Sequence, residues 1–215
     1  MLDNIYERQY GKIVCGVDEA GRGPLVGRVY AAAVILPESY CTEESFEYYE
    51  IYKVLNDSKK LTEKKRFELA PKICETALDY CVAYSEVCEI ESMNILEASL
   101  LAMRRAISGL KIKPDFALID GNMERGFDKI GMNVKAVVGG DGICPSIAAA
   151  SILAKTERDK YCIDYLDKAY PEYGFAKHKG YGTRDHYAAI EKYGLCPEHR
   201  PSFFKKYFER RQNNG

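Results

Sequence analysis

The chain lacks the features that mark several large classes of proteins. Its eight cysteines include no C-x-x-C pair and its three histidines lack zinc spacing, so neither a disulfide framework nor a zinc site is predicted. No apolar run is long enough to span a membrane. The N-terminal segment MLDNIYERQYGK carries acids and aromatics where a signal peptide needs a basic start and an apolar core. We therefore expect a cytoplasmic protein that does not bind membranes.

The chain also lacks a large net charge and any internal repeat. A formal net charge of −1 argues against binding nucleic acid through overall positive charge. From residue 168 onward, however, ten Lys/Arg stand against five Asp/Glu, a bias that a solvated helical surface explains as well as a nucleic-acid contact does. Without a repeat or linker, the sequence predicts one domain, residues 1–215, with a basic helical extension from about residue 168.

The segment Ile13–Pro24, IVCGVDEAGRGP, combines an apolar run, two adjacent acids and a glycine-rich turn. The apolar run is typical of a buried strand that ends at Asp18 and Glu19. A solvated strand end is the ordinary explanation for such a pair. Here two glycines flank Arg22, so the backbone can approach a ligand while a guanidinium lies beside two carboxylates. The combination indicates a site where a metal ion and a phosphate meet.

Adjacent acids on a strand impose a geometric condition. Consecutive side chains of a regular strand face opposite sides of the sheet. Asp18 and Glu19 can therefore share a metal site only if the backbone leaves strand geometry there. Gly16 and the turn at Gly21 lead us to expect such a departure.

Strand and helix patterns alternate along the chain, which predicts an α/β fold. Strands are expected over 13–17, 28–36, 81–87, 116–119 and 134–138, with the first two paired antiparallel through a return at Gly27. Helices are expected over 62–80, 92–110, 145–165 and 184–193, a basic amphipathic tail over 201–211, and a mostly irregular connection over 37–56.

Three apolar runs each deliver acids at their C-terminal end. Asp120 and Asp141 follow the runs at 116–119 and 134–138, as Asp18 and Glu19 follow the first. In open α/β sheets, ligands bind at this edge. The helix beginning at Pro145 starts with small residues, so we expect close packing on the sheet that brings its N-terminus beside Asp141.

Six ordered segments resemble a known family. They are DEAGRGP from Asp18, IDGN with Asp120, GGD with Asp141, AAASILAK from Ala148, HKGYGT from His178 and HRPSF from His199. Together they span nearly the whole chain and resemble bacterial ribonuclease HII, a type 2 ribonuclease H. The related HIII type carries a long extra N-terminal domain, so a motif that begins within twenty residues of Met1 favours HII. Two positions depart from the pattern: Pro201 replaces a frequent second arginine, and Gly139 a frequent lysine.

The resemblance implies the ribonuclease H-like fold, a mixed central sheet flanked by helices, with a C-terminal helical region. It also implies that Asp18, Glu19, Asp120 and Asp141 are the catalytic metal ligands, with Asp18 shared by two ions. Mg²⁺ and Mn²⁺ prefer oxygen ligands, which agrees with this set. Four close carboxylates repel one another, so at least one pKa should be raised without metal.

Substrate choice must depend on the 2′-hydroxyl, which distinguishes RNA from DNA. The resemblance implies that the backbone of Gly21, Arg22 and Gly23 hydrogen-bonds this group and that Tyr181 packs on the ribose at the RNA–DNA junction. From the residues alone, Tyr181 is more readily one structural tyrosine among seventeen. Candidate phosphate contacts, each also explained as a solvated charge, are Lys59, Lys60, Lys177, Lys179 and Arg184. We give the histidines no catalytic role.

The expected function is a monomeric endonuclease that cuts the RNA strand of RNA–DNA hybrids and nicks 5′ of ribonucleotides embedded in duplex DNA. It would leave 3′-hydroxyl and 5′-phosphate ends and act in ribonucleotide removal during DNA replication and repair. One alternative is a nucleotide-binding module, although the G-x-G-x-x-G spacing is missing. A nonenzymatic hybrid-binding protein, expected to have lost an acid, and a nuclease for DNA alone are the others.

Overall fold

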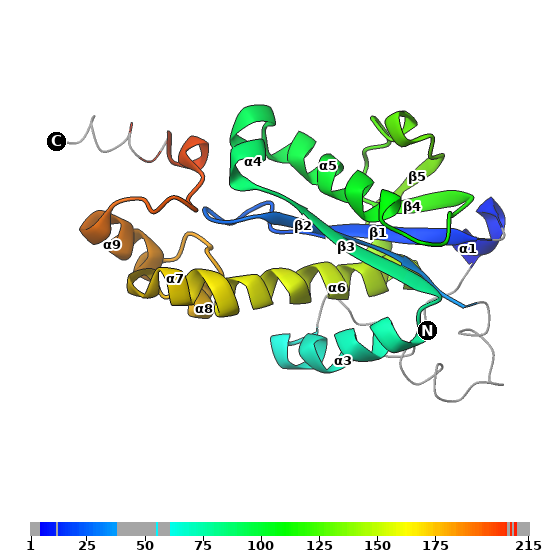
Figure 1. The fold of residues 1–215 in the computed structure, drawn as a ribbon, viewed down its shortest axis with the longest axis horizontal. Helices are drawn as coiled ribbons and strands as arrows, with labels where there is room; N and C mark the ends of the chain where they lie inside the picture. Colours follow the sequence, from blue (N-terminus) through cyan, green and yellow to red (C-terminus); the bar gives the residue numbers. More distant parts are fainter. Residues whose placement is uncertain are drawn as a thin grey trace.

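A five-stranded mixed sheet organises this computed structural model, which describes residues 5–11, 13–37, 55, 61–205, 207 and 209 (Figure 1). The strand order is β3-β2-β1-β4-β5. The strands are β1 (Val14–Ala20), β2 (Val29–Ile35), β3 (Asp79–Ser85), β4 (Phe116–Asp120) and β5 (Val134–Val137). The expected mixed sheet of a ribonuclease H-like fold is confirmed, including the antiparallel pairing of β1 with β2.

Strand direction explains where the acids meet. β1 runs parallel to β4, and β4 runs parallel to β5. The C-terminal ends of these three neighbouring strands therefore lie at one edge of the sheet. β2 and β3 run antiparallel beyond β1 and complete the sheet on its other side.

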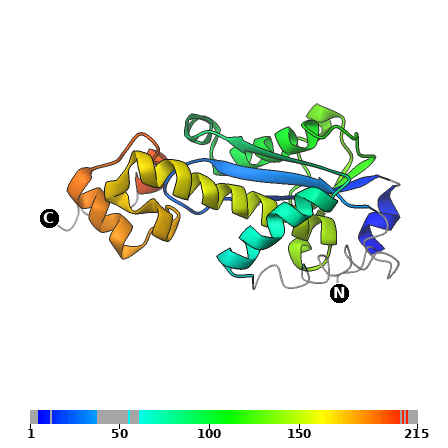
Figure 2. The ribbon, with the colours of Figure 1, turned by 60° about the horizontal axis from the view of Figure 1, so that its bottom comes forward.

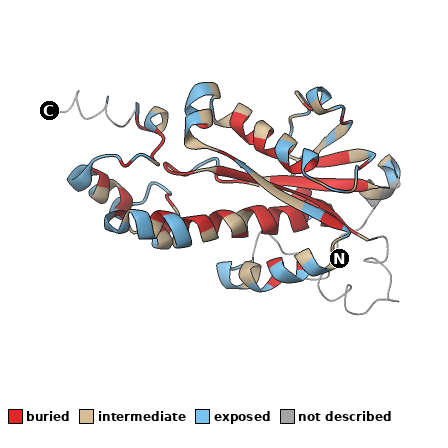
Figure 3. Ribbon diagram, in the orientation of Figure 1, coloured by how far each residue is buried: buried red, intermediate tan, exposed pale blue. Residues whose placement is uncertain are grey.

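Helices cover both faces of the sheet (Figure 1). α6 (Pro145–Tyr161) packs on β1 and β2, with α3 (Glu63–Thr76) outside it. α4 (Val87–Met93) and α5 (Ile95–Ser108) lie on the opposite face. Burial follows this arrangement, since the central strands and α6 are the most continuously buried elements (Figure 3).

Small residues set the distance between α6 and the sheet. A Cβ atom at Gly16 of β1 would lie 2.2 Å from the backbone nitrogen of Ile147. The first turns of α6 are fully buried and rich in alanine, which allows this approach. The predicted close packing of the helix N-terminus on the sheet is confirmed.

The C-terminal helical region lies at one end of the molecule, away from α1 (Ile5–Tyr10) (Figures 1 and 2). Its elements are a π-helix (Cys162–Leu166), α7 (Asp167–Ala169), a 3-10 helix (Pro171–Tyr173), α8 (Phe175–His178), α9 (Arg184–Tyr193) and a second 3-10 helix (Pro201–Phe204). Its apolar core includes Leu25 and Val26 from the connection between β1 and β2. The helical region is thereby packed on the segment that carries the glycine–arginine–glycine turn.

Several element boundaries differ from the prediction, and the strand expected over 81–87 is β3 at Asp79–Ser85. The helix expected to reach residue 80 ends at Thr76, because the following residues from Asp79 pair with β2. The helix expected over 92–110 is preceded by the unpredicted α4, and the two are separated by Asn94, whose φ of 75° breaks the helix. The α-helix expected to reach residue 165 changes to a π-helix at Cys162.

The seven cysteines among the described residues are free, and Cys41 falls outside them. Within the same residues, no helix combines the length and the hydropathy that crossing a bilayer requires. Apart from Pro37 and the buried Leu55, the connection expected over 37–56 also falls outside the described residues.

Candidate active site

Four acidic residues lie at the shared C-terminal edge of β1, β4 and β5. Asp18 and Glu19 belong to the end of β1, and Asp120 is the last residue of β4. Asp141 lies in the 3-10 turn Gly140–Gly142, which follows β5 and leads into α6. The fold thus gathers acids that lie far apart in the sequence, as the strand pattern predicted.

Asp18 is the most deeply buried acid of β1, with 4% of its surface exposed. It lies on the side of α6, where it interacts with Ser151 and Lys155. One carboxylate oxygen also accepts a hydrogen bond of 2.7 Å from the N–H of Glu19. Burial first, then the charges of Glu19 and Asp120, raise the pKa of Asp18 well above its ordinary value, against the opposing charge of Lys155. A bound cation would relieve both costs.

Glu19 lies on the opposite side of the strand. It lines a small pocket of about 90 Å³ together with Asp120 and residues of α5. Its carboxylate oxygen Oε1 pairs with Arg22 Nη1 at 3.1 Å. The expected departure from strand geometry is wrong, because β1 pairs with β2 without interruption until Ala20 lies opposite Tyr30. The two carboxylates start from opposite faces of the sheet but come close enough at its edge for the charge of Glu19 to raise the pKa of Asp18, so a departure from strand geometry is not needed for them to act on one site.

Asp120 holds the turn that carries Asp141. Its oxygen Oδ1 accepts a hydrogen bond of 2.7 Å from the N–H of Gly140. A Cβ atom at Gly140 would lie 2.5 Å from Ile147 Cδ1 and 3.3 Å from that same oxygen, so a side chain there would have to displace Ile147. Asp141 follows directly and is 4% exposed. β4, the turn and the start of α6 thus fix the third and fourth acids relative to each other.

The donor set suits a hard divalent cation. All four side chains offer carboxylate oxygens, which Mg²⁺ and Mn²⁺ prefer. Among the described residues, no three Asp, Glu, His or Cys side chains converge tightly enough to form a ready-made metal cage. Repulsion from Glu19 and Asp120 contributes to the raised pKa of Asp18. The chemistry of the donor set therefore fits Mg²⁺ or Mn²⁺.

A larger cleft of about 470 Å³ begins at Glu19 and extends along α6. It is lined by Glu19, Ala20, Gly21, Arg22, Gly23, Glu63, Arg66, Lys155, Arg158, Asp159, Lys179 and Tyr181. A Cβ atom at Gly23 would lie 3.6 Å from Tyr181 Cε1, so the tyrosine ring stands beside this glycine. The ring is 52% exposed, in keeping with a surface that contacts a ligand. The structure thus brings the glycine–arginine–glycine turn and Tyr181 together.

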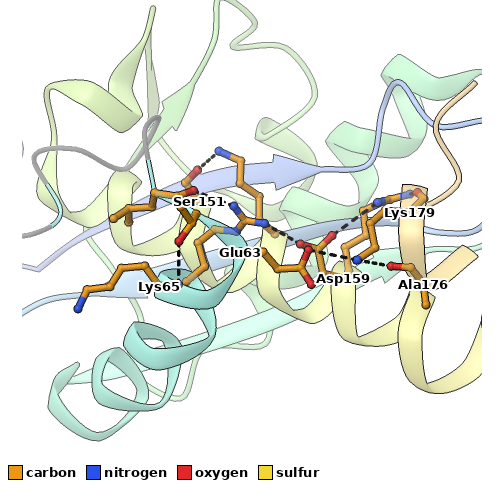
Figure 4. A network of polar contacts seen from close by, with 11 residues as sticks. Glu63, Lys65, Ser151, Asp159, Ala176 and Lys179 are labelled. Atoms are coloured by element: carbon orange, nitrogen blue, oxygen red, sulfur yellow. Dashed lines mark hydrogen bonds and ion pairs between the residues drawn. The ribbon is translucent and has the colours of Figure 1, made fainter. Parts of the chain in front are cut away.

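Ion pairs hold the wall of this cleft (Figure 4). Arg66 of α3 pairs with Asp159 of α6 at 2.7 Å, and Lys179 pairs with Glu63 at 3.2 Å. Lys179 also donates a hydrogen bond to the carbonyl of Ala176. Lys179 is thus a bound component of the wall and not a freely extended cation.

The remaining candidate phosphate contacts lie elsewhere. Lys177 pairs with Asp185 at 2.7 Å on the surface, and Arg184 is exposed at the start of α9. Neither lines the larger cleft. Lys59 and Lys60 fall outside the described residues.

Arg200 organises the turn, a role that sequence reasoning missed. Its guanidinium is fully buried and donates hydrogen bonds to the carbonyls of Pro24 and Gly27 at 2.8 Å and of Arg28 at 3.1 Å. Burial, with the nearby charge of Arg158, lowers the pKa of Arg200 to about 9, so it remains a cation at neutral pH. The motif HRPSF contained this residue, but nothing in its local pattern indicated that its partners lie more than 170 positions away.

The two departures from the family pattern fall at turns. Pro201 is exposed at the start of a 3-10 helix, next to the buried Arg200. Gly139 has a φ of 67°, a left-handed conformation that suits glycine. Neither position is among the residues that line the larger cleft.

Comparisons with known proteins agree with this site. The family model for ribonuclease HII matches residues 15–210. Ribonuclease HII of Aliivibrio salmonicida is 52% identical over 192 residues, covering 89% of this chain and 86% of the relative.

Solved structures give the same result. The ribonuclease H2 of Pyrococcus horikoshii is 29% identical, with a TM-score of 0.69 over 89% of this chain and 93% of that chain. The ribonuclease HII of Archaeoglobus fulgidus, solved in complex with PCNA, is 25% identical, with a TM-score of 0.71 over 88% and 94% of the two chains. The match to the family model over most of the chain, together with the half-identical relative, shows that this chain belongs to the ribonuclease HII family and is a ribonuclease H.

Proposed function

We propose that this enzyme hydrolyses the RNA strand of RNA–DNA hybrids and nicks duplex DNA 5′ of single embedded ribonucleotides, leaving 3′-hydroxyl and 5′-phosphate ends. One observation carries the proposal. The turn with Gly23 and the ring of Tyr181 stand side by side in a cleft that begins at Glu19. The turn and the ring, which would distinguish RNA from DNA, thus share a cleft with Glu19, one of the four acids that would hydrolyse the phosphodiester.

The acids supply the chemistry in this proposal. Asp18, Glu19, Asp120 and Asp141 would hold divalent cations, Mn²⁺ or Mg²⁺ and two in the active complex. Such ions lower the pKa of an attacking water and neutralise charge on the leaving oxygen. The chain keeps Asp18 within reach of Lys155, whose charge favours the ionised carboxylate that a cation requires. Arg22 holds Glu19 at the mouth of the cleft.

The turn and Tyr181 supply substrate selection. Gly21, Arg22 and Gly23 would contact the 2′-hydroxyl through their backbone, since the two glycines leave no side chain in the way. Arg200 donates hydrogen bonds to backbone carbonyls of the connection between β1 and β2 and so fixes the path of this connection. Tyr181 would pack on the ribose at the RNA–DNA junction, where its exposed ring lies beside Gly23.

The remaining functional assignments follow from this activity. We propose a single catalytic domain over residues 1–215 that acts as a cytoplasmic monomer. Its role would be the removal of ribonucleotides during DNA replication and repair. The alternatives without catalysis have less support, because all four acids are retained at one edge of the sheet.

Cleavage of a labelled DNA duplex with one ribonucleotide tests the proposal. The reaction is run with Mn²⁺, Mg²⁺ or a chelator, using the wild type, Asp18→Asn and the control Asp164→Asn, which changes an exposed acid of the π-helix. We expect a metal-dependent nick 5′ of the ribonucleotide that Asp18→Asn abolishes and Asp164→Asn retains. Retained duplex binding without any cut would overturn the proposed chemistry.

A further inference from the structure

The three histidines of the chain form a buried cluster beneath Tyr181. His178, His186 and His199 are 9%, 0% and 1% exposed. The rings of His178 and His186 stack with centroids 4.7 Å apart, and that of His199 lies 5.2 Å from His186. Phe175 packs edge-on against His186. The proposed chemistry uses none of these rings.

Hydrogen bonds determine where the protons of two histidines lie. The N–H of Cys196 donates to His199 Nδ1 at 2.9 Å, so the proton of neutral His199 is on Nε2. This atom lies 3.0 Å from His186 Nε2, which must therefore accept the bond. His186 then carries its proton on Nδ1, which donates to the carbonyl of Tyr181 at 2.9 Å. A directed relay runs from Cys196 through two histidines to Tyr181.

The relay requires both histidines to be neutral. A proton on His186 Nε2 would place two donors against each other, because His199 already donates there. Burial is the main cause that lowers the pKa of both groups to about 4. The relay is therefore intact at neutral pH. His178 adds a separate anchor, since the N–H of Gly180 donates to its Nδ1 at 3.2 Å.

The same residues join the tyrosine segment to the glycine–arginine–glycine turn. His199 forms an isolated antiparallel bridge with Val26. The N–H of Leu25 donates to the carbonyl of Gly180 at 2.8 Å. A Cβ atom at Gly180 would lie 2.1 Å from Val26 Cγ1, so the backbone of Gly180 packs directly on the side chain of Val26. Both sides of the substrate cleft thus depend on the segment around His199.

We propose that His186 and His199 are positioning residues for ribonucleotide recognition: their relay fixes the Tyr181 carbonyl and so holds the tyrosine ring beside Gly23. The proposal rests on the role proposed above for Tyr181. Neither histidine touches the substrate or the cations. If the hydrogen bonds of the relay are lost, the acids stay in place but the tyrosine ring is no longer held against the ribose. Cleavage at a single ribonucleotide is then reduced more than cleavage of a uniform hybrid.

Three variants separate the relay from simple packing. His186→Leu removes both hydrogen bonds of the ring. His186→Asn keeps a nitrogen donor close to the position of Nδ1 and loses the acceptor for His199. Phe175→Leu is the matched control, because it disturbs the same buried cluster without removing either hydrogen bond.

Amide hydrogen exchange tests the positioning directly. The N–H of Thr183 donates to the carbonyl of Tyr181 at 2.8 Å and reports on this segment. We expect exchange over residues 180–183 to become about tenfold faster in His186→Leu, with partial recovery in His186→Asn and no local change in Phe175→Leu. Unchanged exchange in His186→Leu would overturn the proposal, whatever its activity.

A double-mutant cycle with Tyr181→Ala tests the consequence. The readout is the ratio of kcat/KM on a duplex with one ribonucleotide to kcat/KM on a uniform hybrid. His186→Leu should lower this ratio about tenfold in the wild type and leave it unchanged in Tyr181→Ala. Equal losses in both backgrounds would contradict positioning through Tyr181. If Tyr181→Ala lowers the ratio and His186→Leu does not, only the relay proposal fails. If Tyr181→Ala has no effect, the proposed role of Tyr181 and the relay proposal both fail.

Discussion

The carboxylate edge of the sheet and the helical region beneath Tyr181 are built on opposite physical principles. At the sheet edge, strands bring like charges together, and the pKa of Asp18 rises in consequence. In the helical region, three histidines are buried with their ring nitrogens in hydrogen bonds. Without a cation, the close carboxylates of the first region destabilise the fold. The histidines of the second region need no ligand, because their hydrogen bonds are made within the protein. The carboxylate edge is therefore suited to binding cations, and the helical region is suited to keeping a fixed conformation.

Arg200 connects the two regions. Its buried guanidinium binds backbone carbonyls of the connection that follows β1. The neighbouring His199 belongs to the histidine relay. Adjacent residues of one motif therefore serve the turn and the Tyr181 segment. Variants that change one region and leave the other intact test whether the two regions have separate roles.

The largest effect is expected for Asp18→Asn. We expect cleavage to fall by about a thousandfold or more, because the variant removes a ligand of the proposed cations. The same variant should gain stability in chelator at neutral pH, because burial and the charges of Glu19 and Asp120 raise the pKa of Asp18. Because the pKa of Asp18 is raised in the folded state, the carboxyl group loses its proton more readily in the unfolded state as the pH rises. Ionised Asp18 therefore destabilises the fold, and replacing it with Asn should increase the free energy of unfolding.

Thermal unfolding in chelator measures the gain, with Asp164→Asn as the control. A higher Tm than that of the wild type is expected for Asp18→Asn, and an unchanged Tm for Asp164→Asn. A lower Tm would show that the carboxylate stabilises the fold, which contradicts the account of the sheet edge.

The second effect is a pH dependence of stability that belongs to the histidines. Their pKa values of about 4 lie below the ordinary value of 6.5, so the unfolded state binds protons that the folded state does not. Stability should be complete above about pH 6.5 and should fall as the pH drops toward 4, by on the order of 3 kcal/mol for the hydrogen-bonded pair. Urea unfolding at several pH values, compared between the wild type and His186→Asn, measures this. An equally steep fall in both proteins would refute the assignment.

The sequence predicted much of the sheet edge because its signals are local. The buried runs before Asp18 and Asp120 are apolar, and each ends directly at its acid. The helix beginning at Pro145 has small residues where it meets the sheet. In contrast, the spacing of Leu78 predicted that the helix would continue through this residue. The helix ends earlier because the next strand pairs with β2, and Leu78 is 55% exposed.

The helical region was less predictable because its signals are not local. His186 and His199 lie in separate segments, and only the fold brings their Nε2 atoms to 3.0 Å. The carbonyls that Arg200 binds carry no sequence signature at all. Tyr181 was identified through family resemblance, since composition alone made it one tyrosine among seventeen.

The third effect concerns the connection between the regions. Arg200→Lys keeps a cation but cannot reach all the carbonyls that the guanidinium fork binds, so we expect a loss of about 2 kcal/mol in the free energy of unfolding. Ribonucleotide cleavage should also fall, because the turn with Gly23 loses its support. The matched control is Lys168→Arg on the surface. A fully stable and active Arg200→Lys would show that the hydrogen bonds of Arg200 do not connect the two regions.

The smallest effect is expected for Tyr181→Ala. The ring is half exposed, so its removal should leave Tm nearly unchanged. Loss of packing on a ribose should reduce cleavage at a single ribonucleotide by about 10- to 100-fold, the range of one lost stacking contact. Tyr181→Phe keeps the ring and should retain most of this activity.

The most direct test of the separation compares kcat/KM for Asp18→Asn and Tyr181→Ala on two substrates, a DNA duplex with one ribonucleotide and a uniform RNA–DNA hybrid. We predict that Asp18→Asn loses activity on both substrates equally, whereas Tyr181→Ala loses it mainly on the single ribonucleotide. Equal losses on both substrates for Tyr181→Ala would contradict the division between a region for chemistry and a region for recognition.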